Sequence, residues 1–536
     1  MEENPYLKKD ADRLIITSEG HAFLEKIVTD TRGPVYAFTN QASPLITAAA
    51  MARLSRRGSD LREILLDEFV LRGDESADGV IDRVVTGFGD DSVQQLMIVS
   101  MVVENASNIL TKKIEWGRLR AYLEQSTRYI FFDSKDVNGN YRHFVPRLSA
   151  EIEHEYRSTM DRIFDVYSKM VRGMTEYVRT KTKEPSDKKE RIAWLGATRA
   201  QACDVVRPIL PASTMSTVGI VASSQSIEYL ILHLAGERLL ECRKTAKDIL
   251  REARKVAAPF LKRADMPERG GAMVAYRMNT RDAMRELARI YLGNATAGSL
   301  ISKPVVLLDY WPHDELDIVP EMLFGQSTLP ITDIEKATKG LNKHQKEKIF
   351  HAYMGRRLNR RHKPGRAIEK IHYEWQITAD YGTFRDLQRH RMVDMLEWQN
   401  LTTEYGYDVP PLVSDAGYED DFRACFALSE KLYDTMRDAR LEEEAQYATL
   451  LGHKMRYRFM INAREAFHLH ELRTGPQGHP GYRKLVQEMH TELTRVHPLL
   501  GATMKFVNMG EDPELTRLAG ELATQKKLEL LEGEHI

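Results

Sequence analysis

The chain has 536 residues, of which 29% are charged, with a formal net charge of −1 and a pI near 7.0. This length exceeds that of one ordinary hydrophobic core, so two or more domains are expected. The balanced charge gives no overall electrostatic reason to bind nucleic acid or an anionic membrane. No apolar run approaches the ~20 residues needed to span a bilayer. Three isolated cysteines support neither a disulfide framework nor a zinc site, and a reduced cytoplasmic setting with no metal is expected.

The first hundred residues are predicted to be mostly helical around one buried strand. Pro34–Asn40 is predicted to be that strand, and Ser43-Pro44 opens a helix with proline in its first turn. Ser92 is placed to cap an apolar helix that runs to about Asn105.

The next segment, Glu124-Gln125-Ser126-Thr127-Arg128-Tyr129, is the first that suggests chemistry. If the chain is extended to Phe132, the side chains of Glu124, Ser126 and Arg128 point the same way. At roughly 3.3 Å per residue they span about 13 Å, comparable to a nucleoside monophosphate. A carboxylate, a hydroxyl and a guanidinium could then meet a base or ribose edge and a phosphate. A half-exposed strand with an ordinary polar face is the alternative.

Long charged helices are predicted between about residues 133 and 200. A joint rich in glycine and alanine, Gly293–Ser299, suits a domain boundary. After the joint the pattern restarts, because Pro304–Tyr310 echoes Pro34–Asn40. The tail of the chain, rich in lysine and glutamate, is predicted to be a solvated helix.

Two polar segments stand out in the second half. In Arg389-His390-Arg391, guanidinium groups could fork onto phosphates and stack on flat rings while an imidazole bonds ring oxygens, which suits a dinucleotide cofactor. A surface basic triplet is the alternative. On a helix from Met460 to Arg473, Asn462 and Arg473 fall within about 20° of each other, and Arg464 and His468 form an i,i+4 pair on another side. An exposed helix would show the same periodicity.

These segments carry a resemblance to a known family. Arg389-His390-Arg391 resembles the signature of the flavin-dependent thymidylate synthases, the ThyX family, and Glu124–Tyr129 resembles the Glu-x-Ser-x-Arg-Tyr segment that directly follows that signature in the family. Val206–Pro211 resembles the family's Ala-Arg-x-Val-Leu-Pro, and Met460–Arg473 resembles its Asn-x-Arg helix. Here the pieces of one site are divided between the two halves of the chain.

Each half keeps the motifs that the other has lost. The first half keeps the nucleotide-side residues but lacks several flavin-side groups, with Gly89–Leu96, Trp116-Gly117-Arg118, Ser223-Ser224-Gln225 and Leu234 standing in their places. The second half keeps Glu369, Arg389-His390-Arg391 and the Asn462 helix, but has Gln399, Leu401, Thr402 and Gln446 where nucleotide-side residues belong.

A duplication explains this distribution. Arg391 lies 273 positions after Arg118, and Asn462 lies 239 positions after Ser223, so the first copy has the longer middle helices. We therefore predict an α+β protein of two helix-rich ThyX-like repeats, residues 1–298 and 299–536, each with a small mixed or antiparallel sheet.

The resemblance implies reductive methylation of 2′-deoxyuridine monophosphate (dUMP) to thymidylate (dTMP). It implies FAD as cofactor, NADPH and methylenetetrahydrofolate as co-substrates, and a homodimer of pseudo-dimeric chains. Arg473 is the candidate for polarising the uracil ring, with Ser126 beside it in the catalytic site. The substrate-binding residues implied are Glu124, Gln125, Ser126, Arg128, Arg207, Asp386, Arg389 and Arg473, and the cofactor-binding residues are Glu369, Arg389, His390, Arg391, Met392, Asn462, Arg464 and His468.

Departures from the family pattern leave alternatives open. Asp386 replaces a glutamine that in the family reaches the nucleotide, and Arg366 replaces a small hydroxyl residue, so another pyrimidine nucleotide or a hydroxymethyl product is an alternative. The cation-rich run Gly355–Arg366 could contact RNA, which would make the chain a binder or modifier of RNA uridine. The run has no interleaved aromatic residues, so nucleic acid is the less favoured partner.

Overall fold

The computed structural model describes residues 4–10, 13–54, 56–70, 73–81, 91–293, 303–511 and 515–533. The chain forms two compact units. Unit 1 comprises Met1–Glu104, Lys113–Glu124 and Thr217–Ala295, and unit 2 comprises Asn105–Lys112, Gln125–Ser216 and Thr296–Ile536. The boundaries of these two compact units differ from the boundary predicted between the two repeats. Of the joint expected at 293–299, all residues from 294 on lie outside the described residues, so the repeat boundary near 298 stays a prediction. Gly89 and Asp90 also lie outside the described residues.

Unit 1 begins with a small helical subregion. It contains a hairpin of β1 (Leu7–Asp10) and β2 (Arg13–Ile16), followed by α1 (Ser18–Ile27), α2 (Pro44–Arg53), α3 (Leu61–Ile64), a π-helical turn (Leu65–Phe69) and α4 (Gly73–Ile81). The prediction of a buried strand at 34–40 is wrong. Val35 is 83% exposed, and Phe38 makes only one isolated bridge, to Val28. Just before it, the Asp30 carboxylate accepts hydrogen bonds from the amides of Arg32 and Gly33, so the chain turns there.

A three-stranded sheet follows, with β5 (Met215–Ser223) between β3 (Ile98–Ser107) and β4 (Arg120–Glu124). β4 and β5 are antiparallel, from Arg120 opposite Ala222 to Glu124 opposite Val218. The predicted helix from Ser92 to Asn105 is therefore wrong. Only a 3-10 turn (Val93–Gln95) forms there, and the β-branched run after it favours a strand. The other helical elements of unit 1 are α8 (Ser224–Ala235), α9 (Leu240–Ala257), two short turns (Ala258–Asp265, Pro267–Gly271) and α10 (Ala272–Leu292). The helix between β3 and β4 is α5 (Asn108–Ile114), whose first five residues belong to unit 2.

Unit 2 contains a four-stranded antiparallel sheet in the order β6-β7-β9-β8. The strands are β6 (Val305–Trp311), β7 (His372–Asp380), β8 (Met395–Trp398) and β9 (Lys454–Asn462). Its inner face carries fully buried aromatic side chains, among them Tyr373, Trp375 and Phe459. Burial of such large side chains is the main stabilising contribution to this core.

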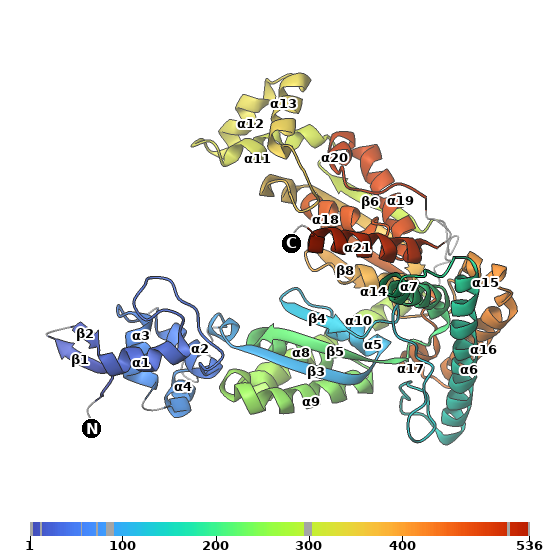
Figure 1. Ribbon diagram of the computed structural model, residues 1–536, viewed down its shortest axis with the longest axis horizontal. Helices are drawn as coiled ribbons and strands as arrows, with labels where there is room; N and C mark the ends of the chain where they lie inside the picture. The colour runs from blue at the N-terminus through green and yellow to red at the C-terminus, as the bar shows by residue number, and fades with distance from the viewer. Residues whose placement is uncertain are drawn as a thin grey trace. The chain divides into compact units, whose positions relative to one another are not determined.

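Helices fill the rest of unit 2, as Figure 1 shows. The first group is α6 (Ala150–Thr180), α7 (Lys188–Val206) and a 3-10 turn (Arg207–Ile209), which includes the long charged helices predicted for this region. The others are a turn (Glu315–Ile318), α11 (Val319–Phe324), α12 (Ile331–Lys339), α13 (Lys343–Met354), a turn (Arg366–Lys370), α14 (Tyr381–Leu387), α15 (Pro411–Asp415), α16 (Glu419–Asp438), α17 (Glu442–Ala445), a turn (Gln446–Ala448), α18 (Ala463–Arg473), α19 (Pro480–Val496), α20 (Pro498–Thr503) and α21 (Thr516–Gly533).

The order of elements recurs between the two halves. The series β3-α5-β4, then β5-α8, matches β7-α14-β8, then β9-α18, and in both sheets the last strand of the series lies between the other two. α14 starts 273 residues after α5, and β9 starts 239 residues after β5. These are the same two offsets that the motifs show. Two copies of one α+β fold account for both observations.

The tail forms the predicted helix, α21, but its first turns pack against α7, while its second half is exposed at the positions described. Leu518 is buried in a cluster with Trp194 and Ala197. Among the described residues, no helix is long and apolar enough to cross a membrane.

Candidate functional site

The segment after β4 is a turn and not the predicted strand. The Ser126 hydroxyl accepts a hydrogen bond from the Arg128 amide at 3.2 Å. The Ser126 carbonyl accepts from the amides of Tyr129 and Ile130 at 3.3 and 3.2 Å. This local bonding, which serine favours, competes with strand pairing. Glu124 ends β4, so Glu124, Ser126 and Arg128 do not share one strand face.

Gln125 also contributes to the form of this turn. Its Oε1 accepts a hydrogen bond from Nη2 of Arg142 at 3.1 Å, and its carbonyl accepts from the Ser216 hydroxyl at 3.3 Å. Its side chain is therefore occupied within unit 2. Glu124 is a buried residue opposite Val218 in the sheet.

The turn directs Arg128 onto a buried carboxylate. Nε and Nη2 of Arg128 donate to the two oxygens of Asp204, on α7, at 2.7 and 2.6 Å. Its guanidinium also lies 5.8 Å from the Tyr482 ring centroid, and Nη1 donates to the Tyr482 hydroxyl at 3.4 Å. Burial alone would lower the pKa of Arg128, but the charge of Asp204 outweighs burial and raises that pKa. The pair is the bidentate geometry typical of strong arginine–carboxylate contacts.

A second ion pair joins Arg207 to Asp386. Nη2 of Arg207, just past the end of α7, lies 3.3 Å from Oδ2 of Asp386 on α14, and both side chains are largely buried. Burial by itself would raise the pKa of Asp386, but the charges of Arg207, Arg128, Arg473 and Arg389 hold it far below its ordinary value. The charges of four arginines therefore act on one carboxylate, two from before residue 298 and two from after it. We call these four arginines with Asp204 and Asp386 the arginine cluster.

Arg473 connects this cluster to a buried histidine. Its Nε lies 2.9 Å from Nε2 of His390, and Nδ1 of His390 lies 2.6 Å from Oε1 of Glu465. The guanidinium of Arg473 also lies 5.3 Å from the Tyr482 ring centroid. Burial first, then the charges of Arg473 and Lys363, keep the pKa of His390 well below its ordinary value. Burial raises the pKa of Glu465 to about 7.

His390, Glu465 and His468 have ligand atoms within 4.8 Å of one another, which is a spacing that could suit a metal ion. Both ring nitrogens of His390 are, however, already in hydrogen bonds. A metal would have to displace Arg473 or Glu465. We therefore assign no metal to these residues.

The predicted flavin-side residues lie mostly on or near the first turns of α18. Asn462 caps this helix, since its Oδ1 accepts from the Glu465 amide at 3.0 Å. Arg464 lies 3.6 Å from Glu369, which also pairs with Arg366 at 3.0 Å. Burial lowers the pKa of His468 to about 4, so its imidazole is neutral near pH 7.

In the triplet Arg389-His390-Arg391, the arginines differ from the histidine in solvent exposure. Arg389 and Arg391 are exposed, as is Met392, whereas His390 is 4% exposed. The triplet is therefore not a simple basic surface patch. Its exposed guanidinium groups could approach a phosphate.

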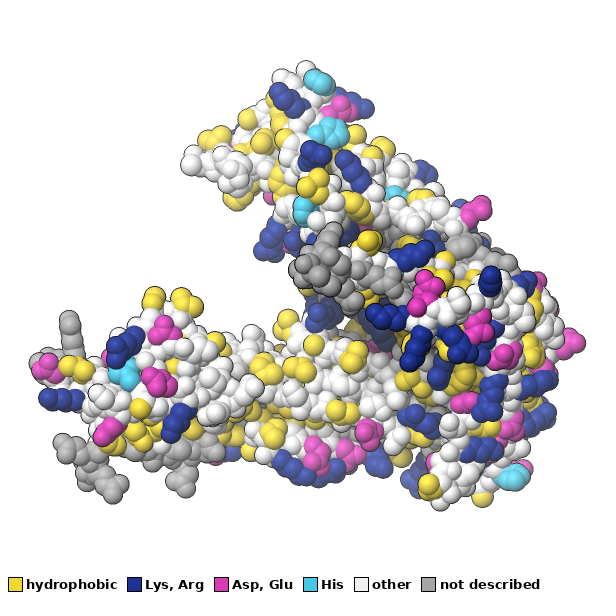
Figure 2. All heavy atoms as spheres, viewed as in Figure 1, with side chains coloured by type: hydrophobic (Ala, Val, Ile, Leu, Met, Phe, Trp, Pro, Cys, Tyr) yellow, Lys and Arg dark blue, Asp and Glu magenta, His cyan; other side chains and the backbone are white. Residues whose placement is uncertain are grey.

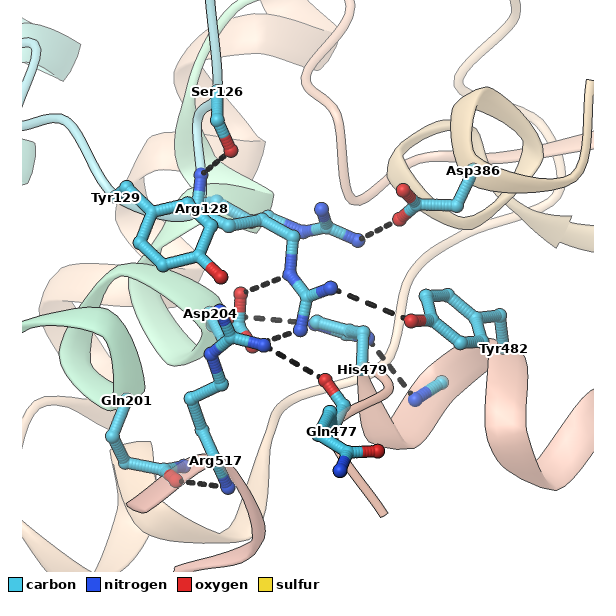
Figure 3. Close-up of polar contacts among 12 residues, drawn as sticks. Ser126, Arg128, Tyr129, Gln201, Asp204, Asp386, Gln477, His479, Tyr482 and Arg517 are labelled. Atoms are coloured by element: carbon cyan, nitrogen blue, oxygen red, sulfur yellow. Dashed lines mark hydrogen bonds and ion pairs between the residues drawn. The ribbon is translucent and has the colours of Figure 1, made fainter. Parts of the chain in front are cut away.

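Sequence reasoning missed several residues of the site. Asp204, Glu465 and Tyr482 contact predicted site residues, and His479 and Arg517 contact their neighbours Asp204 and Tyr129. Figure 3 shows four of these five around Arg128. Two had a signal, because Asp204 lies one helical turn before Arg207, and Glu465 has the capping-box spacing from Asn462. The other three come from segments that only tertiary packing brings near.

Arg517 shows how the C-terminal helix reaches this region. Its guanidinium stacks 4.6 Å from the Tyr129 ring centroid, and Nη1 donates to the Gln477 carbonyl at 2.8 Å. Its amide donates to Oε1 of Gln201 at 2.9 Å. Burial, followed by the charge of Arg128, lowers the pKa of Arg517 to about 10. The helix therefore buttresses the turn that carries Arg128.

A cavity of about 520 Å³ adjoins the cluster within unit 2. Asp204 and His479 belong to its wall, together with Asp380, Asp408 and Asp415. Lys484 is the one lysine or arginine among its described lining residues, against four aspartates, so the cavity does not favour an anion. The anion-attracting part of this region is the arginine cluster itself.

The cation-rich run Gly355–Arg366 is not entirely a solvent-exposed basic surface. Arg357 is buried and makes a bidentate pair with Glu471 at 2.6 Å for both contacts. Its Nη1 also donates to the carbonyl of Thr503. At least this arginine is structural and is not available to nucleic-acid phosphates.

Comparison with known proteins agrees with these motifs. The model of the family described as "thymidylate synthase complementing protein" matches residues 37–259 and 306–499. The match covers most of the chain in two separate segments. The chain belongs to the thymidylate synthase complementing protein family.

The chain is also similar in sequence to two relatives and in structure to two solved proteins. A UPF0159 protein of Chlamydia muridarum is 31% identical over 96% of this chain and 99% of its own length, and one of Thermoplasma acidophilum is 29% identical over 89% and 98%. A UMP/dUMP methylase, PolB, from Streptomyces cacaoi has 17% identity and a TM-score of 0.29, over 38% of this chain and 94% of that chain. ThyX from Helicobacter pylori, complexed with FAD and dUMP, has 18% identity and a TM-score of 0.27, over 37% and 97%. At these TM-scores we draw no conclusion from the two structures.

Proposed function

We propose that this protein catalyses the reductive methylation of dUMP to dTMP. The observation that supports this most is the arginine cluster, in which the charges of Arg128 and Arg207 from before residue 298 and of Arg389 and Arg473 from after it all act on Asp386. Guanidinium groups are suited to phosphate and to the carbonyl oxygens of a uracil ring. One composite site per chain follows, made from residues of both repeats.

Within this site, Arg128 and Arg207 bind the phosphate of the nucleotide. Ser126, with Glu124 and Gln125 next to it, binds the nucleotide and supplies no nucleophile. Arg473 places its positive charge near the uracil carbonyls, which stabilises the negative charge that develops when C5 becomes nucleophilic. Its contact with His390 holds the guanidinium in place for that role.

FAD, reduced by NADPH, supplies the hydride when bound, and methylenetetrahydrofolate supplies the carbon. The residues on the flavin side fit an anionic dinucleotide, because Arg389, Arg391 and Arg464 expose guanidinium groups around α18. Met392 offers an exposed apolar side chain beside them, and Glu369 and Asn462 orient the arginine and the helix. His390 is bonded on both nitrogens, so its part in this arrangement is to orient Arg473.

Another pyrimidine nucleotide is a second candidate substrate, and Asp386 is the observation in its favour. A glutamine can donate and accept hydrogen bonds, whereas an ionised aspartate only accepts. The base or sugar that faces Asp386 would therefore need a donor. RNA uridine is disfavoured, because part of the basic run is buried in an ion pair.

We also propose that two chains associate as a homodimer. Unit 1 has apolar side chains exposed on the outer face of its three-stranded sheet, among them Val102 and Leu123. Exposed apolar side chains of this kind are suited to self-association.

Tritium release from C5-labelled dUMP tests the proposed reaction. The purified protein should carry or take up FAD, and it should release tritium only when NADPH and methylenetetrahydrofolate are both present. A protein that takes up no flavin under any condition, or that releases no tritium when loaded with flavin, would rule the reaction out. Release from UMP in place of dUMP would support the second candidate.

A further inference from the structure

The contact between Arg473 and His390 fixes the tautomer of the histidine. An arginine Nε carries hydrogen at any ordinary pH and can only donate. Nε2 of His390, 2.9 Å away, must therefore accept. A neutral imidazole with an accepting Nε2 has its hydrogen on Nδ1, and this hydrogen points to the Glu465 carboxylate at 2.6 Å.

We propose, on the basis of the function proposed above, that Glu465 is a positioning residue that holds Arg473 in its binding orientation through His390. The ionised carboxylate accepts from Nδ1–H and so selects the tautomer that can receive Arg473. With the hydrogen on Nε2 instead, two donors would face each other at 2.9 Å. Arg473 would then leave this position, and the charge aimed at the substrate would move with it.

The chain holds Glu465 firmly enough for this role. Glu465 lies in the first turn of α18, with its amide bonded to the cap residue Asn462. Glu465 is 7% exposed to solvent. The carboxylate is therefore largely shielded from bulk water, and its hydrogen bond to His390 is shielded from competition.

The charges around Glu465 make its ionisation sensitive to pH near neutrality. Burial opposes the charged form, and the positive charges of Lys363, Arg473 and Arg464 favour it. His468 also faces the carboxylate, but its pKa of about 4 leaves it neutral near pH 7. The result is a pKa of about 7. His390 faces it too and stays neutral. Below that pH the carboxyl can donate to Nδ1 and so permits the tautomer that repels Arg473.

Nucleotide affinity should report this coupling. In the wild-type protein, the affinity for dUMP should fall as the pH is lowered through 7. Glu465→Gln has a neutral amide that can donate or accept, so at every pH it should show the weaker affinity of the acidic wild-type protein. The difference at pH 8 should be roughly tenfold, the order expected for one hydrogen bond to a charged group. Titration of the nucleotide phosphate cancels in the ratio of the two affinities.

A matched control is Glu488→Gln on α19. Glu488 is also partly buried with a pKa raised by burial, and no contact with His390 is found for it. This variant should keep the wild-type dependence of affinity on pH. Flavin content should be equal in all three proteins, because the proposed effect acts on the nucleotide side.

A second measurement does not depend on the nucleotide. Long-range proton–nitrogen NMR of ¹⁵N-histidine-labelled protein distinguishes the two tautomers, and the His390→Gln variant identifies the signal. The wild-type protein at pH 8 should show hydrogen on Nδ1 of His390, and Glu465→Ala should shift it toward Nε2. An unchanged tautomer in Glu465→Ala would overturn the inference, even in an active enzyme. A shifted tautomer in a protein that never binds dUMP would leave the inference intact and remove the proposed function.

Discussion

At the scale of the residue, the site consists of arginines that are already paired. Arg128 has Asp204, Arg207 has Asp386, and Arg473 has His390. Buried charges of this kind are costly to separate, because removing one partner leaves the other without compensation. The pairs hold the guanidinium groups in position before any ligand arrives. Preorganisation of this sort lowers the cost of binding.

Arg128→Ala should therefore act on stability as well as on binding. It leaves Asp204, whose side chain is 2% exposed, without its partner, which should cost about 3–5 kcal/mol of unfolding free energy. The double variant Arg128→Ala with Asp204→Asn should recover part of that loss, as measured by urea denaturation. It should still bind dUMP more weakly than the wild-type protein, with normal flavin content. Costs that simply add in the double variant would show that the two residues are not coupled.

At the scale of the element, helices decide what the motifs can reach. α18 presents Arg473 and Glu465 toward His390, while Arg464 turns to Glu369. Asn462 caps the helix, so Asn462→Ala is expected to weaken α18 by about 1 kcal/mol in addition to any loss of flavin. The C-terminal helix α21 supports the turn of Arg128 through Arg517 and Tyr129.

Leu518→Asp tests whether α21 is part of the packed structure. The substitution places a carboxylate in the cluster with Trp194 and Ala197, which should cost about 2–4 kcal/mol. Leu528→Asp on the same helix is the control, since Leu528 is 56% exposed, and it should change stability by less than about 0.5 kcal/mol. Equal effects in chemical denaturation would mean that α21 does not pack as described.

At the scale of the whole molecule, the two repeats have diverged on one corresponding face. In unit 2 the outer face of the sheet is polar, with Glu374 paired to Arg458. In unit 1 the corresponding face exposes Ile98, Val102 and Leu123, and Figure 2 shows apolar side chains over the stretch that holds β3, β4 and β5. An apolar face that one copy has and the other lacks indicates a different use, which the proposed homodimer supplies.

The variant with both Val102→Glu and Leu123→Glu should therefore be less associated than the wild-type protein. Charges on both partners would face one another across a pair of like surfaces, so the dimer should dissociate at concentrations where the wild-type protein stays associated. Sedimentation equilibrium measures this difference directly. Gln376→Glu on the polar sheet of unit 2 is the control, and it should leave association unchanged. A wild-type protein that is monomeric at every concentration would contradict the proposed homodimer.

The sequence by itself determined the family and the α+β class, because motifs such as Arg389-His390-Arg391 and the Asn462 helix keep fixed spacings along the chain. The site residues that it indicated stay a prediction. The expectations were wrong where local propensity was the only guide. In the strand expected at 124–132, the chain turns after β4, because the Ser126 hydroxyl accepts from the Arg128 amide and the Ser126 carbonyl accepts from the next two amides. In the helix expected at 92–105, a strand forms from Ile98 on and pairs with β5 far along the chain.

The tertiary structure decided which charged side chains of the site are paired with one another. Asp204 and Glu465 are ordinary helical carboxylates in the sequence, and only long-range packing sets them against Arg128 and His390. The tautomer of His390 likewise follows from a neighbour 83 positions away. Burial makes such contacts strong, and burial is a property of the folded chain that no local pattern specifies.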